Sequence, residues 1–451
     1  MKPIKKLIET LKNIWAIEEL RNRLLLTFGL IFVYRLGSFI VLPGLNPYAL
    51  EALQSQSNQG ILGLINMFTG GAFNQASIFA LGVMPYISAS IFMQLAGIII
   101  PQFAKLQKEE SGRNKINLYT RYLTILVGGA QAVAYVTGMI KMQYSAAIVI
   151  DWPLFMVSSI IILTASTLFI MWLGEKITDK GVGNGVSLLI MVGILARFPA
   201  SIVQEFSSKA AEDKVLIFII EMLALIIVVV GLVMLAEGVR RIPLNYAKKL
   251  VGNFSMKEIG GGARNFIPLK VNSGGVMPII FAQALMFIPS MIAGFVTDPE
   301  KSDASSWVHQ LNDFTSWQYN VIFAILVIAF TYFYTALTFN PTELADNLKR
   351  NNSFIPGIKP GQPTADYIGA IMDRITLPGS VFLAIAGILP GIVALFGVSQ
   401  GLAIFFGGTS MLIGVSVIID FIQQVDSYML NKHYDGLMKT GRVTTRERAT
   451  I

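Results

Sequence analysis

Long apolar runs separated by short polar segments set the pattern of this chain. Ten of these runs are near the 20 residues that an α-helix needs to cross the hydrocarbon core of a bilayer. By residue number, they lie at 24–42, 76–101, 119–140, 153–173, 184–205, 215–238, 275–297, 319–340, 375–397 and 403–428. The pattern predicts an all-α polytopic membrane protein with ten transmembrane helices, and a composition that is 54% hydrophobic and 14% charged favours the same class.

The stretch from 60 to 94 is apolar, but two glycines at 70 and 71 and a proline at 85 interrupt it. In lipid, backbone N–H and C=O groups freed by such a break must face protein or a water-filled cavity. The part from 60 to 73 is too short to cross a bilayer, whereas the part from 76 to about 101 is long enough. We therefore expect a short half-helix folded into a cavity, followed by a membrane span.

Residue types that are scarce or absent exclude several kinds of chemistry. The chain has no Cys, so it forms no disulfide and offers no thiolate. Its two His residues both fall in polar sequence, which argues against metal-dependent or His-dependent catalysis. The sequence contains neither a Gly-rich nucleotide-binding loop with Lys nor an intramembrane catalytic pair. We expect neither an enzyme nor a bound cofactor or metal.

The positive charges fall almost entirely on one side of the predicted spans. With the N-terminus inside, and with Arg121 counted in the inner segment 102–121 and Arg197 with the outer loop that follows its span, the inner segments hold 29 Lys and Arg residues and the outer segments hold 5. By the positive-inside rule, both termini are then cytoplasmic. Arg35 lies within the first span, where it either snorkels toward the outer surface or faces the interior of the bundle. The sequence leaves both orientations open.

The order of the segments predicts two related halves. Residues 1–23 have the spacing of an amphipathic helix that lies on the cytoplasmic face. A cleavable signal peptide is the weaker alternative, because the following run carries Arg35 and lacks a small-residue cleavage site. The five spans within 24–205 and the five within 206–428 start on opposite sides of the membrane, so halves that share a fold are related by inverted topology. Residues 429–451 form a cytoplasmic tail.

Two long polar segments on the cytoplasmic side, 239–274 and 341–374, contrast with the modest outer loops. Their cations serve at least to anchor the chain by the positive-inside rule. Ile, Val, Phe and Tyr interleave with these cations, and Pro356, Pro360 and Pro363 stiffen the second segment, unlike a flexible Ser/Gly linker. We therefore favour a cytoplasmic docking surface over simple anchoring.

Several long motifs in this sequence match one family. They are NMFTGGAFNQASIFALGVMPYISASIFMQ (66–94), EESGRNKINLYTRY (109–122), MWLGEKITDKGVGNGVSLLI (171–190), NYAKK with IPLKVNSGGVMPIIFA (245–249 and 267–282), FYTALTFNPTELADNLKRNNSFIPGIKPG (333–361) and FGGTSMLIGVSVIIDF (406–421). Through these motifs the chain resembles the SecY/Sec61α family of protein-conducting channels, the bacterial form more closely, over nearly its whole length. The resemblance implies a clamshell of two inverted five-helix halves around an hourglass pore.

The resemblance also implies a ring of branched aliphatic side chains at the waist of the pore. The ring positions are Val83, Ile87, Val186, Ile190, Ile280 and Ile413. Such side chains have no hydrogen-bonding atoms, so a narrow ring of them dewets and blocks ions without holding a passing polypeptide. Val83 with Ile87, and Val186 with Ile190, are i,i+4 pairs that share a helix face. Val186 lies near the start of its predicted span, whereas a ring residue is expected near mid-membrane. Its position therefore supports the assignment to the ring less well.

A plug and a lateral gate complete the pore that the resemblance implies. The plug corresponds to about 60–73, with candidate residues Ile65, Asn66, Met67, Phe68, Gly70 and Gly71. The polar residues of the gate would be Ser88, Gln94, Gln131 and Gln283, each deep in an apolar run. Intramembrane hydrogen bonds are worth only about 0.5 to 2 kcal/mol, which suits a gate that must open. Packing within the bundle is the alternative role for Ser88 and Gln131.

In the family, the two long cytoplasmic loops bind the ribosome or the motor ATPase SecA. The matching positions are Arg240, Arg241, Lys248, Lys249 and Lys359. Their charges suit phosphates of ribosomal RNA or carboxylates of the motor. Lys359 stands where the family usually has Arg, so the charge is kept and the bidentate fork is lost. Further implied partners are SecE-like and SecG-like small membrane subunits, insertase and other accessory membrane proteins, signal sequences, nascent chains and the lipid bilayer.

The resemblance thus implies the central pore-forming subunit of the Sec translocon, in the bacterial plasma (inner) membrane. Such a subunit passes unfolded secretory polypeptides across the membrane and releases transmembrane segments sideways into lipid. A secondary transporter of a small solute is the main alternative, because it shares inverted repeats and broken helices. It needs charged groups at mid-membrane, and the two buried candidates, Glu221 and Asp420, lie toward helix ends and form no evident pair. A structural assembly subunit without a pore is the third hypothesis.

Overall fold

The computed structural model describes residues 14–15, 17–54, 66, 69–141, 144–246, 265–295 and 313–447. The chain divides into two compact units. Unit 1 comprises Met1–Ser208, Ser290–Ser305 and Ser416–Ile451, and unit 2 comprises Lys209–Pro289 and Ser306–Val415. Three helices cross the boundary between the units, namely α10 (Gly185–Ala211), α12 (Met277–Phe295) and α18 (Gly408–Glu447).

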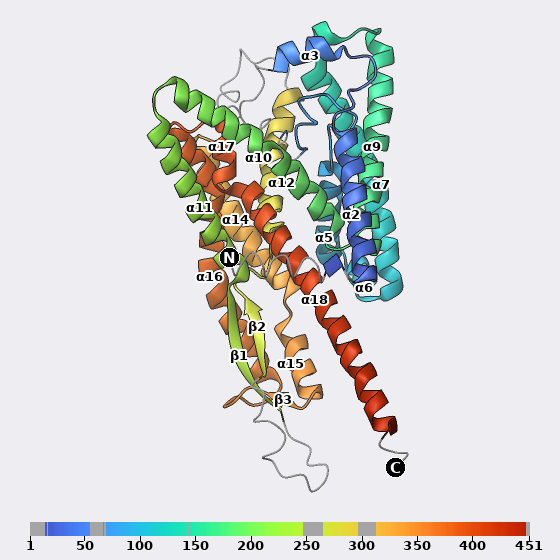
Figure 1. Ribbon diagram of the computed structural model, residues 1–451, viewed down its shortest axis with the longest axis vertical. Helices are drawn as coiled ribbons and strands as arrows, with labels where there is room; N and C mark the ends of the chain where they lie inside the picture. Colours follow the sequence, from blue (N-terminus) through green and yellow to red (C-terminus); the bar gives the residue numbers. More distant parts are fainter. Residues whose placement is uncertain are drawn as a thin grey trace. The chain divides into compact units, whose positions relative to one another are not determined.

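Unit 1 holds most of the helices from the first part of the chain (Figure 1). Besides its share of the three crossing helices, its elements are α2 (Glu18–Gly37), α3 (Pro47–Gln54), α5 (Met84–Ile99), α6 (Pro101–Lys108), α7 (Glu110–Ala134), the π-helix η1 (Tyr135–Ile140), the 3₁₀ turn η2 (Ser145–Ala147) and α9 (Trp152–Lys180). Two isolated β-bridges, Val41 with Ser77 and Leu45 with Ile148, tie the connection after α2 to later segments.

Unit 2 combines membrane-length helices with a small sheet. Its elements are α11 (Val215–Glu237), β1 (Val239–Tyr246), β2 (Asn265–Lys270), α14 (Trp317–Thr338), α15 (Pro341–Arg350), β3 (Ser353–Phe354), α16 (Gln362–Leu395), α17 (Gln400–Ala403) and the 3₁₀ turn η3 (Ile404–Phe406). Figure 1 shows the sheet beyond the ends of α11 and α14, beside α15.

The three strands form a sheet in the order β2-β1-β3, with both pairings antiparallel. The prediction of an all-α protein did not include this sheet. Burial alternates along β1, because Ile242 and Leu244 are buried while Arg241 and Pro243 are exposed, and this period of two is the mark of a half-buried strand. β3 pairs only with the last two residues of β1, so Pro243, which lacks an N–H, has a single neighbouring strand.

Seven helices in the described part of the chain are long and apolar enough to cross a membrane. They span Asn114–Ile140, Trp152–Lys180, Gly185–Ala211, Val215–Glu237, Trp317–Arg350, Gln362–Leu395 and Thr409–Leu430. The other three predicted spans correspond to α2, α5 and α12. α2 carries several charged residues, and α5 has only 16 residues.

The predicted helix over 76–101 is wrong at its start. α5 begins at Met84, and residues 77–83 form a bridge and turns instead. Backbone and side-chain hydrogen bonds of Ser77 hold these turns, since Phe79 N donates to Ser77 Oγ and Ala80 N donates to Ser77 O. Polar side chains that bond to nearby backbone groups compete with helix formation in this way.

Candidate functional site

The turn at Gly70 and Gly71, at the C-terminal end of the predicted plug, is closed by local hydrogen bonds. Gly71 N donates to Asn66 O at 2.8 Å, Asn74 N donates to Asn66 Oδ1 at 3.0 Å, and Phe73 N donates to Thr69 Oγ1 at 3.1 Å. Both glycines have a positive φ, +66° and +96°, which residues with a Cβ rarely adopt. Asn66 is fully buried, and its Nδ2 has no hydrogen-bond partner among the described residues.

Side chains from two other elements hold this turn from outside. Arg35 of α2 donates from Nη1 to the Gly70 carbonyl at 2.9 Å, and Tyr135 of η1 donates its hydroxyl to the Phe73 carbonyl at 2.5 Å. A Cβ on Gly70 would stand only 2.9 Å from the Gly193 Cα of α10, so that helix also presses on the turn. Of the two orientations open for Arg35, the structure shows the inward one.

Most of the predicted plug lies outside the described residues. Ile65, Met67 and Phe68 are in that part, whereas Asn66, Gly70 and Gly71 are described. Nothing in the sequence indicates the role of Tyr135, which lies 62 residues from its acceptor. In the structure it begins a π-helix, a feature often found at functional sites.

Val83 and Ile87 lie at the start of α5. Val83 is the N-cap residue and is buried, and Ile87 N donates to Val83 O at 3.1 Å. Pro85 follows within the first turn, where its missing N–H costs no helical hydrogen bond. The break that the sequence shows at Pro85 is therefore a helix start.

Val186 and Ile190 lie in the first turns of α10. Val186 Cγ2 is 2.9 Å from the place where a Cβ on Gly174 of α9 would stand. Since Gly174 lies six residues before the end of α9, Val186 lies about 9 Å inward from that end. α10 begins at Gly185, no earlier than predicted. Val186 nevertheless lies away from the end of α9, because the chain turns back along α9 before α10 begins.

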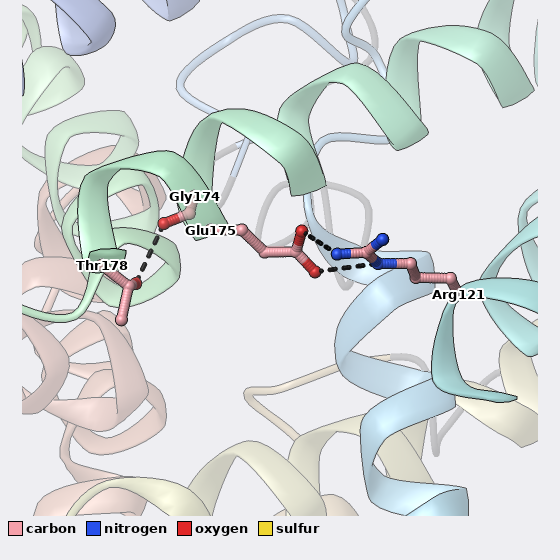
Figure 2. Close-up of polar contacts among 4 residues, drawn as sticks. All are labelled: Arg121, Gly174, Glu175 and Thr178. Atoms are coloured by element: carbon pink, nitrogen blue, oxygen red, sulfur yellow. Dashed lines mark hydrogen bonds and ion pairs between the residues drawn. The ribbon is translucent and has the colours of Figure 1, made fainter. Parts of the chain in front are cut away.

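Thr178 joins α9 to the start of α10. Its hydroxyl donates to the Gly174 carbonyl at 2.9 Å and accepts from Gly185 N at 2.9 Å, and Figure 2 shows the first of these bonds. A Cβ on Gly185 would stand only 2.0 Å from the Gly174 oxygen, so the two backbones touch. Together, Gly174, Thr178 and Gly185 fix the height and direction of Val186.

The same part of α9 is fastened to α7 by an ion pair. Arg121 donates from Nη2 to Glu175 Oε2 at 2.6 Å and from Nε to Oε1 at 3.2 Å, in the two-pronged geometry that Figure 2 shows. Both side chains are partly exposed. The residues are 54 positions apart, and nothing in their spacing indicates the pair.

The turn between α9 and α10 is also held by the two ends of the chain. Val182 N donates to Thr27 Oγ1 of α2 at 3.1 Å, and Gly183 N donates to Gln424 Oε1 of α18 at 2.8 Å. Leu20, Leu24, Val182 and Val425 form a small buried cluster beneath it. The part of α18 from Ser416 onward therefore packs within unit 1.

The remaining ring candidates, Ile280 and Ile413, belong to unit 2. Ile280 is half-buried on α12, and Ile413 on α18 is 1% exposed. The neighbouring Phe281 meets Phe330 and Tyr334 of α14 edge-on, at centroid distances of 5.9 and 5.7 Å, which fixes the rotation of α12 and thereby the direction of Ile280. A complete ring of six residues stays a prediction, because its members are divided between the two units.

The predicted gate residues differ in how their polar atoms are satisfied. Ser88 donates to the Met84 carbonyl at 3.1 Å and Gln94 donates to Ser90 Oγ at 3.3 Å, both within α5. Gln131 is half-buried. Gln283 differs, since its Oε1 is buried without a hydrogen-bond partner in the described part of the chain.

Two expectations about intramembrane acids are wrong. Glu221 of α11 does form a pair, because Lys209 Nζ lies 3.6 Å from its Oε1, with side chains only 11% and 8% exposed. Lys209 also donates to the Gly397 carbonyl at 2.8 Å. Asp420 is exposed rather than buried. Hydropathy does not indicate the pair, because the predicted span ends at 205, whereas α10 continues to Ala211 and includes Lys209.

The two long polar loops join in one folded domain, the sheet domain, made of β1, β2, β3, α15 and the start of α16. Its buried core consists of Ile242, Leu244, Leu269, Leu348, Ile355, Ile368 and Met372. Arg240, Arg241 and Lys359 are exposed on it, and the Arg241 guanidinium lies over the Phe266 ring at 4.8 Å. Lys248 and Lys249 lie outside the described residues.

A model of the SecY family matches residues 77–422 of this chain. The chain belongs to the SecY family. It is 39% identical over 439 residues to the protein translocase subunit SecY of Mycobacterium tuberculosis (strain ATCC 25618 / H37Rv), which covers 93% of this chain and 97% of the relative. It is also 39% identical over 429 residues to the same subunit of Vibrio cholerae, covering 94% and 95%.

Solved structures share the fold. The channel described as "The structure of a protein conducting channel" superposes with a TM-score of 0.64 at 17% identity, over 89% of this chain and 91% of that one. A SecY structure from work on its plug domain gives 0.59 at 18% identity, and Sec61 from a canine ribosome-channel complex gives 0.57 at 17%, both with the same coverage. These channels have the ten-helix fold, so the prediction of ten membrane helices is confirmed.

The family match decides the class of the protein. The chain is the pore-forming subunit of a SecY protein-conducting translocation channel, and it is not an enzyme. The predicted family and channel function are confirmed, while the roles of individual residues stay predictions.

Proposed function

We propose that residues 60–73 form a plug and that Val83, Ile87, Val186, Ile190, Ile280 and Ile413 form the ring through which an unfolded polypeptide passes. The strongest support is the base of the plug, since the Gly70–Gly71 turn is held by Arg35 and Tyr135 from two other elements. One related structure comes from work reporting that the SecY plug domain stabilises the closed state and maintains a membrane seal. We assign the same role to this segment.

Conductance of single channels in planar bilayers tests the plug. Deletion of residues 60–65, which keeps Asn66 and the hydrogen bonds that close the turn, should open a leak to ions that the full chain does not show. Replacement of the same residues by a Gly/Ser segment of equal length controls for shortening of the chain. If the full chain, the deletion variant and the Gly/Ser variant all conduct no ions, this segment is not a plug.

Release of apolar segments sideways into lipid is the second part of the proposal. Gln283 supports lateral release, because its amide oxygen is buried without a hydrogen-bond partner in the described residues. An unsatisfied buried oxygen destabilises the observed conformation, and an open conformation of the gate can offer it a partner. Ser88 and Gln94 are already satisfied within α5, so they add little to holding a gate shut. Gln131 and Gln283 are therefore the better candidates among the four.

The sheet domain is proposed as the docking surface for a ribosome and for the SecA motor. A Sec61 relative has been solved in a ribosome-channel complex. Exposed Arg240, Arg241 and Lys359 stand on a folded domain with its own core, which anchoring by charge alone does not require. SecE-like and SecG-like subunits, insertase and other accessory membrane proteins complete the proposed partners, and co-purification tests each of them.

The proposed orientation places both termini and the sheet domain in the cytoplasm of a bacterium. Because the chain has no Cys, single cysteines can be introduced on a silent background. With a membrane-impermeant maleimide, Lys359→Cys should label only in inverted vesicles and Glu212→Cys only in intact cells with a permeable outer envelope. The reverse labelling pattern would overturn the orientation.

A solute transporter finds little support in the charged groups. Glu221 is already paired with Lys209, and Asp420 is exposed, so neither offers a free charge at mid-membrane. Liposomes made from this chain alone should show no coupled uptake of small solutes.

A further inference from the structure

Two consecutive backbone N–H groups in the turn between α9 and α10 are bound by side chains of other helices. Val182 N donates to Thr27 Oγ1 of α2 at 3.1 Å, and Gly183 N donates to Gln424 Oε1 of α18 at 2.8 Å. The partners lie 155 and 241 residues apart along the chain. Both turn residues are buried, and a buried N–H without a partner costs free energy, so the turn depends on helices near the two ends of the chain.

Thr27 is bonded on both sides. It is 1% exposed, and its hydroxyl accepts from Val182 N while it donates to the Arg23 carbonyl of its own helix at 2.9 Å. A Cβ on Gly181 would collide with Thr27 Oγ1, so the turn passes directly against this hydroxyl. A buried Thr in a helix ordinarily bonds back to the preceding turn, and Thr27 differs because it also holds a segment of another helix pair.

Gln424 holds the same turn from α18. Gly183 has a φ of +90°, and a Cβ there would stand 3.5 Å from Cδ2 of Phe421, three residues before Gln424. The next residue of α18, Val425, shares a small buried cluster with Val182. Polar and apolar contacts of α18 therefore meet on two adjacent residues of the turn.

The turn leads directly into α10, which carries two of the proposed ring positions. Residues 181–184 belong to no helix or strand, so their path depends on these bonds. Gly183 comes three residues before Val186 and seven before Ile190. Because α10 begins at Gly185, directly after the turn, a shift of the turn changes where both side chains lie.

We propose that Thr27 and Gln424 are positioning residues for the ring, and that they thereby set how apolar a signal sequence must be to open the channel. The inference rests on the proposed ring. Without either bond, a buried N–H of the turn loses its partner, and the turn can take another path that restores one. Val186 and Ile190 then close the ring less tightly, and signal sequences with a shorter apolar core suffice.

A selectivity ratio tests this role, in strains where each variant replaces the wild-type chain. The ratio compares export of one reporter that carries a crippled signal sequence with export of the same reporter that carries the intact one. Because it is a ratio, it does not change when a variant only lowers the amount of folded channel. Thr27→Val keeps the size of the side chain and removes the hydroxyl, whereas Thr27→Ser keeps the hydroxyl. Gln424→Leu and Gln424→Glu form a second pair, without and with an acceptor for Gly183 N.

Thr124→Val in α7 is the matched control. Thr124 is also 1% exposed, and its hydroxyl donates within its own helix, to the Thr120 carbonyl at 2.7 Å. Its loss removes a buried hydroxyl of unit 1 without touching the turn between α9 and α10.

The selectivity ratio should rise about 2- to 12-fold in Thr27→Val and in Gln424→Leu, as expected for the loss of one hydrogen bond. It should stay at the wild-type value in Thr27→Ser, Gln424→Glu and Thr124→Val. An unchanged ratio in Thr27→Val or in Gln424→Leu would remove that residue from the role, and an equal rise in Thr124→Val would overturn the inference.

Ile413→Asn separates this inference from the proposed function. If Ile413→Asn raises the ratio while Thr27→Val and Gln424→Leu do not, the positioning role fails and the ring stands. If Ile413→Asn also leaves the ratio unchanged, the proposed ring itself fails.

Discussion

Val186 at the start of α10 packs directly on Gly174 of α9, where a Cβ would stand 2.9 Å from Val186 Cγ2. The glycine thus leaves the space that the ring candidate occupies. The adjacent Glu175 binds Arg121 of α7, so the surface beneath Val186 is itself anchored. The position of one proposed ring residue therefore depends on a helix that holds none of the proposed ring positions.

Gly174→Ala should displace Val186 and loosen the ring. Overpacking of this kind costs about 1 to 3 kcal/mol, taken up by a shift of α10. We expect a raised ion leak and easier export of a reporter with a weakened signal sequence. Gly129→Ala in α7 is the matched control, because a Cβ there meets nothing within 4 Å. Equal behaviour of the two variants would show that Gly174 does not position the ring.

The ring itself is tested by polar substitution. Ile413→Asn or Val83→Asn should wet the constriction and let poorly apolar signal sequences open the channel, because branched aliphatic side chains exclude water and amides do not. Export of a reporter with a crippled signal sequence gives the measurement, and Ile413→Leu serves as the apolar control. Export at the wild-type level in the Asn variants would remove these residues from the ring.

The buried pair of Lys209 and Glu221 should matter for stability. Glu221→Gln leaves the Lys209 charge buried with a weaker partner, at a cost of about 3 to 5 kcal/mol. The exposed pair of Glu212 and Lys214, with side chains 53% and 54% exposed, is the control, and Glu212→Gln should barely change the melting temperature, because solvent screens an exposed ion pair. Thermal unfolding in detergent compares them. A similar shift in melting temperature for both variants would mean that burial adds nothing to the first pair.

Lys359 tests the sheet domain as a motor contact. Lys359→Glu should impair motor-driven export more than insertion of membrane proteins, because an exposed cation that meets motor carboxylates becomes repulsive. Lys359→Arg, which restores the usual family residue, should export at least as well as wild type. Equal loss of export and insertion in Lys359→Glu would argue against a motor contact.

Much of the architecture follows from local sequence, because lipid demands long apolar helices and the chain contains ten apolar runs. The break at Gly70–Gly71 was also readable, since positive φ favours glycine. The sheet was not predicted, although β1 alternates, because β1 and β3 lie more than 100 residues apart and only the fold pairs them.

The sequence indicates a candidate site residue only where the type of its own side chain suits the proposed role. Branched aliphatic and basic residues can be proposed from the resemblance, whereas the residues that position them cannot. Tyr135, Gly174 and Glu175 act through partners that are distant in sequence, and a tyrosine or glycine in an apolar run gives no hint of them. Val186 shows the same limit, since its depth depends on how the chain turns back along α9.

The central claim, that a polypeptide passes through the ring, is tested most directly by disulfide crosslinking. A stalled secretory chain with one cysteine is captured in channels that carry Ile87→Cys on the Cys-free background. Ile226→Cys on α11, an exposed apolar position, is the control. We predict a crosslink to Ile87→Cys that depends on stalling, and none to Ile226→Cys. Crosslinks of equal yield at both positions, or none at Ile87→Cys, would contradict passage through this ring.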